Sequence, residues 1–365
     1  MKISARKCNF TIVGPEHDGW DAYVQQHPSG SIFHTRAIIR AFAVAGSIEP
    51  MALAALDDLG RIVAMLVSSH VKTLRDFCSL SSRAVLYAEP LCEPNPDGIA
   101  ALQALLRQHD EQMRGQAVLC EVRSSCAPGS EREALIRCGY DHRDYINYIV
   151  NLDAPIDVLW QRVHKNLRQK IRASLRKGIE LRDDNSQAGI ERLYRLLQFS
   201  YGRARVPLLG RENFDAVMEY LPVGSVRLRT AFDAGQPVAS TISLLHAGRI
   251  YSWYGGTLRL AGSSPFACLV WDDIRWGAEH GYSIYDFGGA GWPHEDYGPR
   301  KFKAGFGGTE VRYGRYLLTY SRLRLRLAEL AYGVSRRLGV WSHLSASESS
   351  FDPPNEIANL GEKTG

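Results

Sequence analysis

Three consecutive strand-like segments, followed by a helix and a further strand, are the feature that most limits the fold of this chain. The helical segment 266–280 ends at Gly281, a typical stop signal. The first third of the chain holds a similar mixture, with strands at 52–56 and 62–68 on either side of a turn. The expected strands in the second half are 225–232, 237–246, 250–254 and 284–287, and further helices are expected at 98–113, 189–201 and 211–221. The pattern predicts an α/β (α+β) chain with mixed central sheets flanked by helices.

The length of the chain indicates more than one domain. It has 365 residues, of which 45% are hydrophobic, and single hydrophobic cores rarely grow beyond about 250–300 residues. We expect an N-terminal domain over 1–150 and a second domain over 151–316. An amphipathic helix over 317–341 and a polar, disordered tail over 342–365 would follow.

A faint repeat relates the two halves. Asp58-Leu-Gly60 followed by Val63-Ala64 parallels Asp233-Ala-Gly235 followed by Val238-Ala239, and in both places a D-x-G turn joins two strands. Such turns are common enough to match by chance. Their equivalent positions in the two halves favour a duplication.

Charge and cysteine content place few limits on partners. The net charge of +5 is mildly basic, and the seven cysteines form no C-x-x-C pair. No stretch approaches the roughly 18 apolar residues of a membrane span, and the first residues lack a signal-peptide core. We expect a cytoplasmic protein without a bound metal, either soluble or peripheral at the inner face of the membrane.

The expected helix 156–177 carries a basic stripe. At 100° per residue its cations fall on one side and its apolar residues on the other. The stripe consists of Arg162, Lys165, Arg168, Arg172 and Arg176. A solvated face normally interleaves carboxylates and this one has none, so we favour binding of phosphates, from tRNA, coenzyme A or a nucleotide- or lipid-linked substrate.

Several motifs between 237 and 308 together resemble the FemAB family of the GNAT acyltransferase superfamily. They are Pro237-Val-Ala239, Tyr251-Ser-Trp-Tyr-Gly-Gly256, the tryptophan-rich segment from Pro265 to Gly281, Tyr285-Asp-Phe-Gly-Gly289, and Lys301-Phe-Lys303-Ala-Gly305-Phe-Gly-Gly308. The resemblance implies two tandem GNAT-like domains. It also implies transfer of an aminoacyl group from tRNA, or of an acyl group from a coenzyme A thioester, to an amine, with no permanently bound cofactor.

The segment from Arg259 through Gly262 to Ser264 resembles a degraded GNAT donor loop. Small residues before a helix let backbone N–H groups approach a pyrophosphate. Ser264 departs from the family pattern, which favours a tRNA-borne donor over coenzyme A. The alternative is a plain loop that ends at Pro265, in the first turn of the helix.

Two residues are the candidates for catalysis. Asp286, at the end of a strand, could orient or deprotonate the amine, or only cap the following turn. Lys303 takes the lysine position of the family motif and could stabilise the oxyanion or hold phosphate. If the segment is extended, Lys301 points to the same face as Lys303 and adds a second cation.

The remaining candidates concern the acceptor and the membrane. Tyr254 and Trp292, beside glycines, could line a cleft for a sugar or base. The amphipathic helix 317–338 could dock on an anionic membrane or pack on the second domain. The sequence thus predicts an acyltransferase of peptidoglycan or surface-polysaccharide synthesis, acting on a nucleotide- or lipid-linked amine. The alternative is a catalytically decayed GNAT scaffold that binds RNA or protein.

Overall fold

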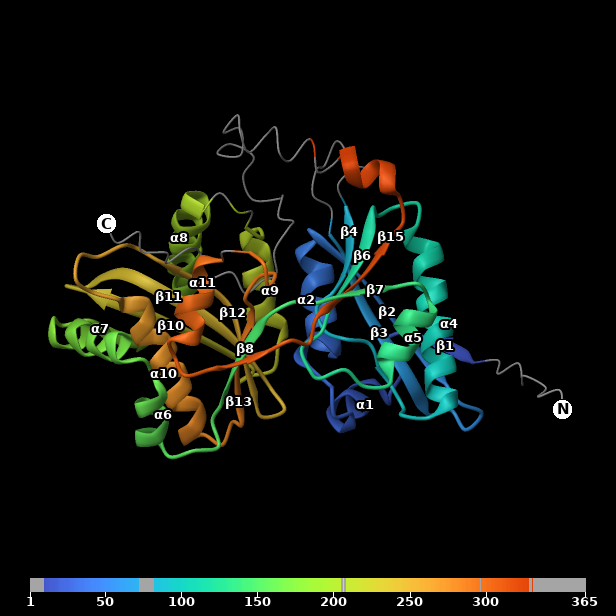
Figure 1. The fold of residues 1–365 in the computed structure, drawn as a ribbon, viewed down its shortest axis with the longest axis horizontal. Helices are drawn as coiled ribbons and strands as arrows, with labels where there is room; N and C mark the ends of the chain where they lie inside the picture. The colour runs from blue at the N-terminus through green and yellow to red at the C-terminus, as the bar shows by residue number, and fades with distance from the viewer. Residues whose placement is uncertain are drawn as a thin grey trace. The chain divides into compact units, whose positions relative to one another are not determined.

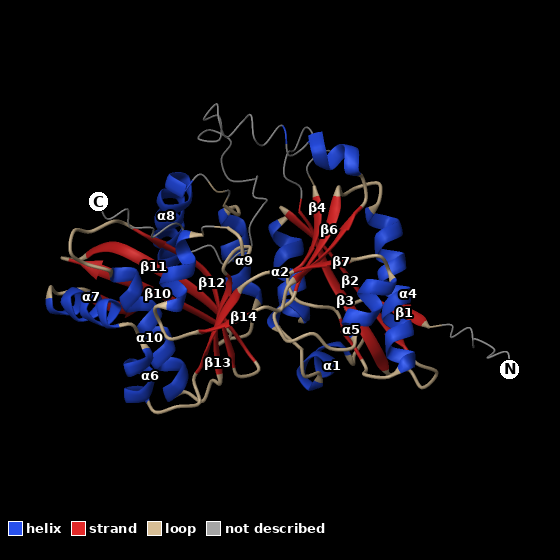
Figure 2. Cartoon of the chain, viewed as in Figure 1, coloured by secondary structure: helices blue, strands red, loops and turns tan. Residues whose placement is uncertain are grey.

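The computed structural model describes residues 10–71, 82–204, 206, 208–295, 297–327 and 330. The chain divides into two compact units (Figure 1). Unit 1 holds residues 1–143 and 313–334, and unit 2 holds residues 144–312 and 335–365. In each unit a central sheet carries helices on its faces (Figure 2). The expected mixed α/β architecture is therefore confirmed.

Unit 1 is built on one mixed sheet. Its strand order is β1-β2-β3-β4-β6-β15-β7, with β5 paired to β3. The strands are β1 (Thr11–Val13), β2 (Ile48–Leu56), β3 (Ile62–Val71), β4 (Arg83–Leu86), β5 (Leu91–Cys92), β6 (Leu119–Arg123), β7 (Asp141–Arg143) and β15 (Arg315–Thr319). The helices are α1 (Trp20–Gln26), a 3₁₀ turn η1 (Ile32–His34), α2 (Arg36–Ala45), α4 (Pro96–Met113) and α5 (Glu131–Arg137).

Helix α4 packs on the sheet and contributes much of the core of unit 1. Asn95 accepts a hydrogen bond from the Gly98 amide at 2.8 Å, and Pro96 occupies the first turn, so the helix starts where a cap and a proline coincide. Its leucines follow helical spacing and pack on alanines of the sheet, Ala64 and Ala84 among them. The helix expected over 98–113 is confirmed.

Unit 2 has a second mixed sheet of order β14-β8-β13-β12-β11-β10-β9. Its strands are β8 (Asn147–Asn151), β9 (Glu180–Asp183), β10 (Val226–Asp233), β11 (Gln236–His246), β12 (Arg249–Thr257), β13 (Ile284–Gly289) and β14 (Thr309–Val311). Its helices are α6 (Ile156–Arg162), α7 (Lys165–Arg176), α8 (Gln187–Ala204), α9 (Arg211–Tyr220), α10 (Pro265–Glu279) and α11 (Gly298–Ala304). The strands expected at 225–232, 237–246, 250–254 and 284–287 and the helix expected at 266–280 are thus present in the expected order.

Helices α8 and α10 both pack closely on β12. A Cβ at Gly255 would lie 2.4 Å from the ring of Phe266 in α10, and one at Gly256 would lie 2.5 Å from the Leu196 backbone in α8. Only a residue without a side chain lets both helices come this close to the strand. The two glycines of the Trp-Tyr-Gly-Gly motif therefore set how tightly this sheet is packed.

Within the described residues the chain crosses between the units twice. β8 follows β7 of unit 1 in sequence but pairs with β13 and β14 of unit 2, and β15 follows β14 but pairs with β6 and β7 of unit 1. The division near Arg143 lies close to the expected boundary at 150. The segment after 312, however, rejoins unit 1, so the sequence-based division at 316 does not follow the sheets.

Two expected helices differ from the structure. The helix predicted over 156–177 is broken at Val163 and His164, whose backbone is extended. Arg168 caps the last turn of α6 through the carbonyls of Trp160 and Gln161, at 3.2 and 2.8 Å. The helix predicted from 317 begins instead as strand β15, because 315–319 completes the first sheet; helix resumes at residues 322–327 and 330. The expected tail 342–365 lies outside the described residues.

Candidate active site

The most informative feature of unit 2 is the point at which two parallel strands part. β12 and β13 pair over three residue pairs, from Arg249 opposite Ile284 to Tyr251 opposite Asp286. β12 then runs on to Thr257, while β13 turns through a register shift against β8 after Asp286. In the described sheet, residues 252–257 of β12 therefore have no strand partner on the β13 side. Such an edge can accept the amide groups of an extended ligand.

Asp286 occupies the vertex of this opening. Its side chain is 3% exposed; one carboxylate oxygen pairs with the Arg249 guanidinium at 3.1 Å and the other accepts the Gly288 amide at 2.7 Å. The second contact is the turn cap that the sequence offered as the structural alternative. The first fixes a negative charge at the last paired position of β13.

Lys303 lies behind the same strand end. Its ammonium is fully buried and donates to the carbonyls of Phe287 and Gly289, the residues through which β13 diverges. The segment is helix α11, not an extended strand, so residues two apart face opposite sides and Lys301 is exposed. The paired cation expected from Lys301 and Lys303 is therefore wrong.

The glycine turn after α11 serves the fold. Gly307 has φ +75°, and a Cβ there would lie 2.6 Å from the Arg162 side chain. The neighbouring Gly305 carbonyl accepts the His164 amide at 2.7 Å. The turn thus packs into the break between α6 and α7, and only glycine fits at position 307.

The loop 258–264 joins β12 to α10 and is surrounded by cations. Gly262 is left-handed (φ +65°), and its carbonyl lies 3.1 Å from the Lys177 ammonium. Burial and the neighbouring Arg259 lower the pKa of Arg203 at the end of α8. Lys177 thus contacts the loop directly, Arg259 belongs to it and Arg203 lies near Arg259, so three cations lie in or near the loop that leads into α10, a combination that attracts phosphate.

A family comparison agrees with this geometry. Residues 161–299 match the model of the acetyltransferase (GNAT) domain. Most of unit 2 is therefore similar to a GNAT domain. The match begins in α6 and ends in α11, so it includes the diverging strands and the loop before α10. No curated protein matches the chain.

Solved structures extend the likeness to both units. FemX shares 14% identity with a TM-score of 0.63, covering 89% of this chain and 99% of that one. The C-terminal domain of a protein assigned as a lysylphosphatidylglycerol synthetase, from Agrobacterium fabrum, shares 17% identity with a TM-score of 0.57, covering 86% and 94%. L-PGS from Bacillus licheniformis shares 15% identity with a TM-score of 0.55, covering 90% and 99%. The expected resemblance to FemAB-like GNAT proteins is confirmed, at identities that establish the fold.

The predicted basic stripe does not face the loop of the GNAT domain. Helix α7 touches the loop through Ser174, whose hydroxyl accepts the Ser264 amide at 2.7 Å. Arg172 and Arg176 each lie two positions from Ser174 and hence about 200° around the helix. Arg168 caps α6, and Arg172 stacks 5.3 Å from the Trp160 ring, while Lys165 and Arg176 are exposed. Of the basic residues near the loop, Lys177 and Arg203 were not predicted, because only the fold brings them there.

The aromatic candidates have different surroundings. Tyr254 is buried in the core of the GNAT domain, with its ring 5.0 Å from Phe214 and 5.9 Å from Tyr201. Trp292 is half-buried and packs edge-on against Tyr145 at 4.8 Å. Packing explains Tyr254, whereas Trp292 keeps an accessible edge.

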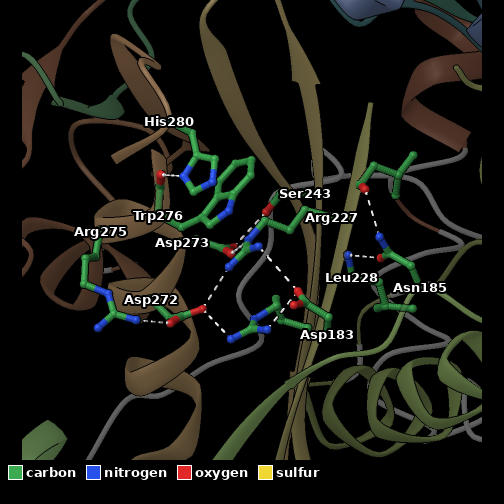
Figure 3. Close-up of polar contacts among 12 residues, drawn as sticks. Asp183, Asn185, Arg227, Leu228, Ser243, Asp272, Asp273, Arg275, Trp276 and His280 are labelled. Atoms are coloured by element: carbon green, nitrogen blue, oxygen red, sulfur yellow. Dashed lines mark hydrogen bonds and ion pairs between the residues drawn. The ribbon is translucent and has the colours of Figure 1, made fainter. Parts of the chain in front are cut away.

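A buried ionic network holds α10 against the sheet (Figure 3). Arg227 of β10 donates to Asp273 at 2.8 Å and to Asp272 at 2.9 Å, and Arg229 reaches Asp272 at 2.7 Å. The Arg227 guanidinium also lies 4.3 Å from the Trp276 ring. The network lies at the C-terminal half of α10, so it orients the helix whose other end carries the cationic loop.

Unit 1 contains one group of potential metal ligands among the described residues. His109, Asp110 and Cys120 are buried with ligand atoms within 4.8 Å of one another. The same Asp110 oxygen accepts hydrogen bonds from Tyr140 at 2.8 Å and Tyr320 at 2.6 Å. The group therefore ties the segment after β15 into the core of unit 1. The sequence alone did not reveal the group, because only the fold brings Cys120 of β6 next to His109 and Asp110 of α4.

No helix in the described part of the chain has both the length and the hydropathy that a bilayer-spanning segment requires.

Proposed function

We propose that this protein is an acyltransferase that moves an acyl or aminoacyl group from a phosphate-bearing donor, coenzyme A or tRNA, to an amine. The observation that carries the proposal is the divergence of β12 from β13 immediately past Asp286. The unpaired edge of β12 can hold an extended donor by backbone hydrogen bonds. The loop at its far end gathers Arg259, Arg203 and Lys177, which suit the donor's phosphates.

In the proposed reaction the amine attacks the donor's acyl carbon directly. The new C–N bond forms, and the bond to the thiol sulfur of coenzyme A or to the tRNA oxygen breaks. The amine loses a proton and the leaving group gains one. Asp286, held by Arg249 at the vertex, orients the amine or takes its proton. Lys303 acts as a positioning residue through the carbonyls of Phe287 and Gly289.

The acceptor class follows from relatives of the same fold. Two of these relatives carry the names FemX and lysylphosphatidylglycerol synthetase. They support a nucleotide- or lipid-linked amine of the cell wall or a surface polysaccharide as the acceptor we propose here. The exposed Lys165, Lys301 and Arg176 and the half-buried Trp292 remain our candidates for contacts with it or with tRNA.

The test is calorimetric titration with acetyl-CoA at low salt, on the wild-type chain and two variants. Lys177→Gln removes a cation beside Gly262, and Arg176→Gln removes the neighbouring exposed cation that points away from the loop. For a coenzyme A donor we expect one site per chain and about a threefold to tenfold loss of affinity for Lys177→Gln alone, the effect of one exposed charge pair. Equal losses in both variants would contradict binding at the loop.

A different result would favour the alternatives. If acetyl-CoA does not bind but tRNA does, with a steep salt dependence that Arg176→Gln weakens, the donor is aminoacyl-tRNA. One observation favours a decayed scaffold: the Ser264 amide, which could face a phosphate, is already bonded to Ser174. Binding of tRNA with no transfer of its aminoacyl group to any amine would support that second function.

A further inference from the structure

The helix that follows β15 presents a row of leucines to solvent. Leu323, Leu327 and Leu330 are 70%, 47% and 67% exposed. Their spacing of four and three residues places them on one face of a helix. Isolated exposed leucines are ordinary on a protein surface, but three aligned on one helical face form an apolar strip.

One flank of this helix is anchored to unit 1. The Arg324 guanidinium donates to the carbonyls of Arg114, Gly115 and Ala117 at the end of α4, at 3.0 to 3.4 Å. One residue before the helical segment, the Ser321 amide donates to the Val118 carbonyl at 3.2 Å. The helix, drawn in orange-red in Figure 1, is thus held against unit 1 while its three leucines stay exposed.

Basic side chains border the leucine strip. Arg322 and Arg326 are exposed and lie one turn apart, about 90° around the helix from the centre of the leucine row. Within residues 321–330 the sequence holds three arginines, at positions 322, 324 and 326, and one carboxylate, Glu329, so the segment is net basic. An apolar strip flanked by arginines at this angle matches a membrane interface, where leucines enter the acyl region and guanidiniums meet the phosphates.

We propose that the leucine strip, made of Leu323, Leu327 and Leu330, is a docking surface for an anionic phospholipid bilayer. The charge of Arg322 and Arg326 selects the anionic headgroup, and the leucines supply the apolar contact. The surface belongs to unit 1 and needs no acyl donor, so it goes beyond the proposed transfer reaction. Membrane attachment of this kind would bring the protein to lipid-linked molecules.

The test is sedimentation of the full chain with vesicles. We expect binding to phosphatidylcholine vesicles that contain phosphatidylglycerol and little binding to phosphatidylcholine alone. The double variant Leu323→Ser/Leu327→Ser should weaken binding by about tenfold or more. The control Ile136→Ser, on another exposed helix of unit 1 at 51% exposure, should bind like the wild type.

Charge is tested separately. Arg322→Gln/Arg326→Gln should lose about thirtyfold in affinity for anionic vesicles, because the two cations near such a surface together contribute about 2 kcal/mol. All four positions are exposed, so circular dichroism should report an unchanged fold. Wild-type binding by the leucine variant, or equal binding to neutral vesicles, would overturn the proposal. So would a dimer, seen by light scattering, that the leucine variant dissociates.

Discussion

The two units share details of strand pairing, although their sequences share only a faint repeat. In unit 1, Ala55 lies opposite Ala64 on the hairpin of β2 and β3, and a register shift follows at once. In unit 2, Ala231 lies opposite Ala239 on the hairpin of β10 and β11, with a register shift at the same place. The faint sequence repeat falls on these two hairpins, which hold equivalent positions in the two sheets.

An ion pair is repeated as well. Arg83 of β4 and Glu121 of β6 sit on adjacent parallel strands, and Arg249 of β12 and Asp286 of β13 occupy the same register in unit 2. In unit 1, Arg123 and Arg315 also bind Glu121, so three guanidiniums surround one carboxylate. In unit 2 the described partners of Asp286 are Arg249 and a backbone amide.

The difference lies in what surrounds the pair. β4 is paired with β6 over all of its four residues, whereas β12 extends well past the pairing with β13. The two carboxylates at this equivalent position therefore differ in their surroundings. Glu121 of unit 1 lies within a salt-bridge cluster, whereas Asp286 of unit 2 lies beside an unpaired strand edge. One topology can stabilise a sheet in one copy and supply a site in the other, and four experiments test that distinction.

The largest expected effect is on the stability of unit 1. Glu121→Gln removes the negative charge from among three buried guanidiniums, which should lower the free energy of unfolding of unit 1 by about 3–5 kcal/mol. Hydrogen exchange followed by mass spectrometry resolves the two units and would detect this loss in unit 1 peptides. Glu133→Gln, at an exposed pair with Arg137, should change stability by less than about 0.5 kcal/mol. Unchanged exchange in β6 would show that the cluster does not stabilise the sheet.

The equivalent change in unit 2 should affect turnover more than stability. Asp286→Asn keeps an oxygen for the Gly288 amide but removes the base, so acyl transfer from whichever donor binds should fall by about a hundredfold or more. The free energy of unfolding should fall by only about 1–3 kcal/mol, from the weakened Arg249 contact. Full turnover in this variant would make Asp286 a purely structural counterpart of Glu121.

The third prediction is that low pH destabilises unit 1 more than unit 2. Burial by itself would raise the pKa of Glu121, but Arg123, Arg315 and Arg83 together hold it well below 4.5. The stability it contributes is therefore present above pH 4.5 and lost as the pH falls further. Burial raises the pKa of Asp273 in unit 2, so its contribution changes in the opposite sense. Hydrogen exchange between pH 6 and 3 should show unit 1 opening first, and in Glu121→Gln, whose unit 1 is destabilised at every pH, this pH dependence should be lost.

The smallest effect concerns the repeated hairpins. Gly60 and Gly235 have φ of +75° and +78°, and a Cβ at either would meet nothing within 4 Å. Gly60→Ala and Gly235→Ala should each cost about 1–2 kcal/mol, from backbone strain alone. Gly115→Ala and Gly202→Ala, with open space and ordinary φ, are the matched controls and should not destabilise. Unequal costs at Gly60 and Gly235 would mean that the two turns are not under the same constraint.

Sequence patterns predicted the elements that bury one face. The periodicity of 98–113 and 266–280, with proline at the start and glycine or polar residues at the end, fixed both helices closely. The break at Val163 was not visible, because it depends on Arg168 capping α6 and on Gly307 approaching Arg162. β15 read as helix because Arg315–Thr319 continues into a helical repeat, and its pairing with β6 is a contact between distant parts of the chain.

The candidate site, like the fold, was predictable only where local sequence specifies it. Motif positions singled out Asp286, Lys303 and the loop at Gly262, whose roles remain predictions. They could not reveal that the Lys303 ammonium is buried on two carbonyls, or that Lys177 and Arg203 reach the loop from α7 and α8. Those relations depend on how helices end and pack, which local sequence does not specify.

The return of β15 to the first sheet has a consequence for how the chain is made. A ribosome finishes Arg143 long before it reaches Arg315, so the sheet that is begun first is completed by residues translated after every strand of the second sheet. Domains that complete themselves in sequence can fold one after another during synthesis. Here β6 and β7 are synthesised early but lack the strand between them until β15 is made. A chain released before Thr319 would never complete the first sheet.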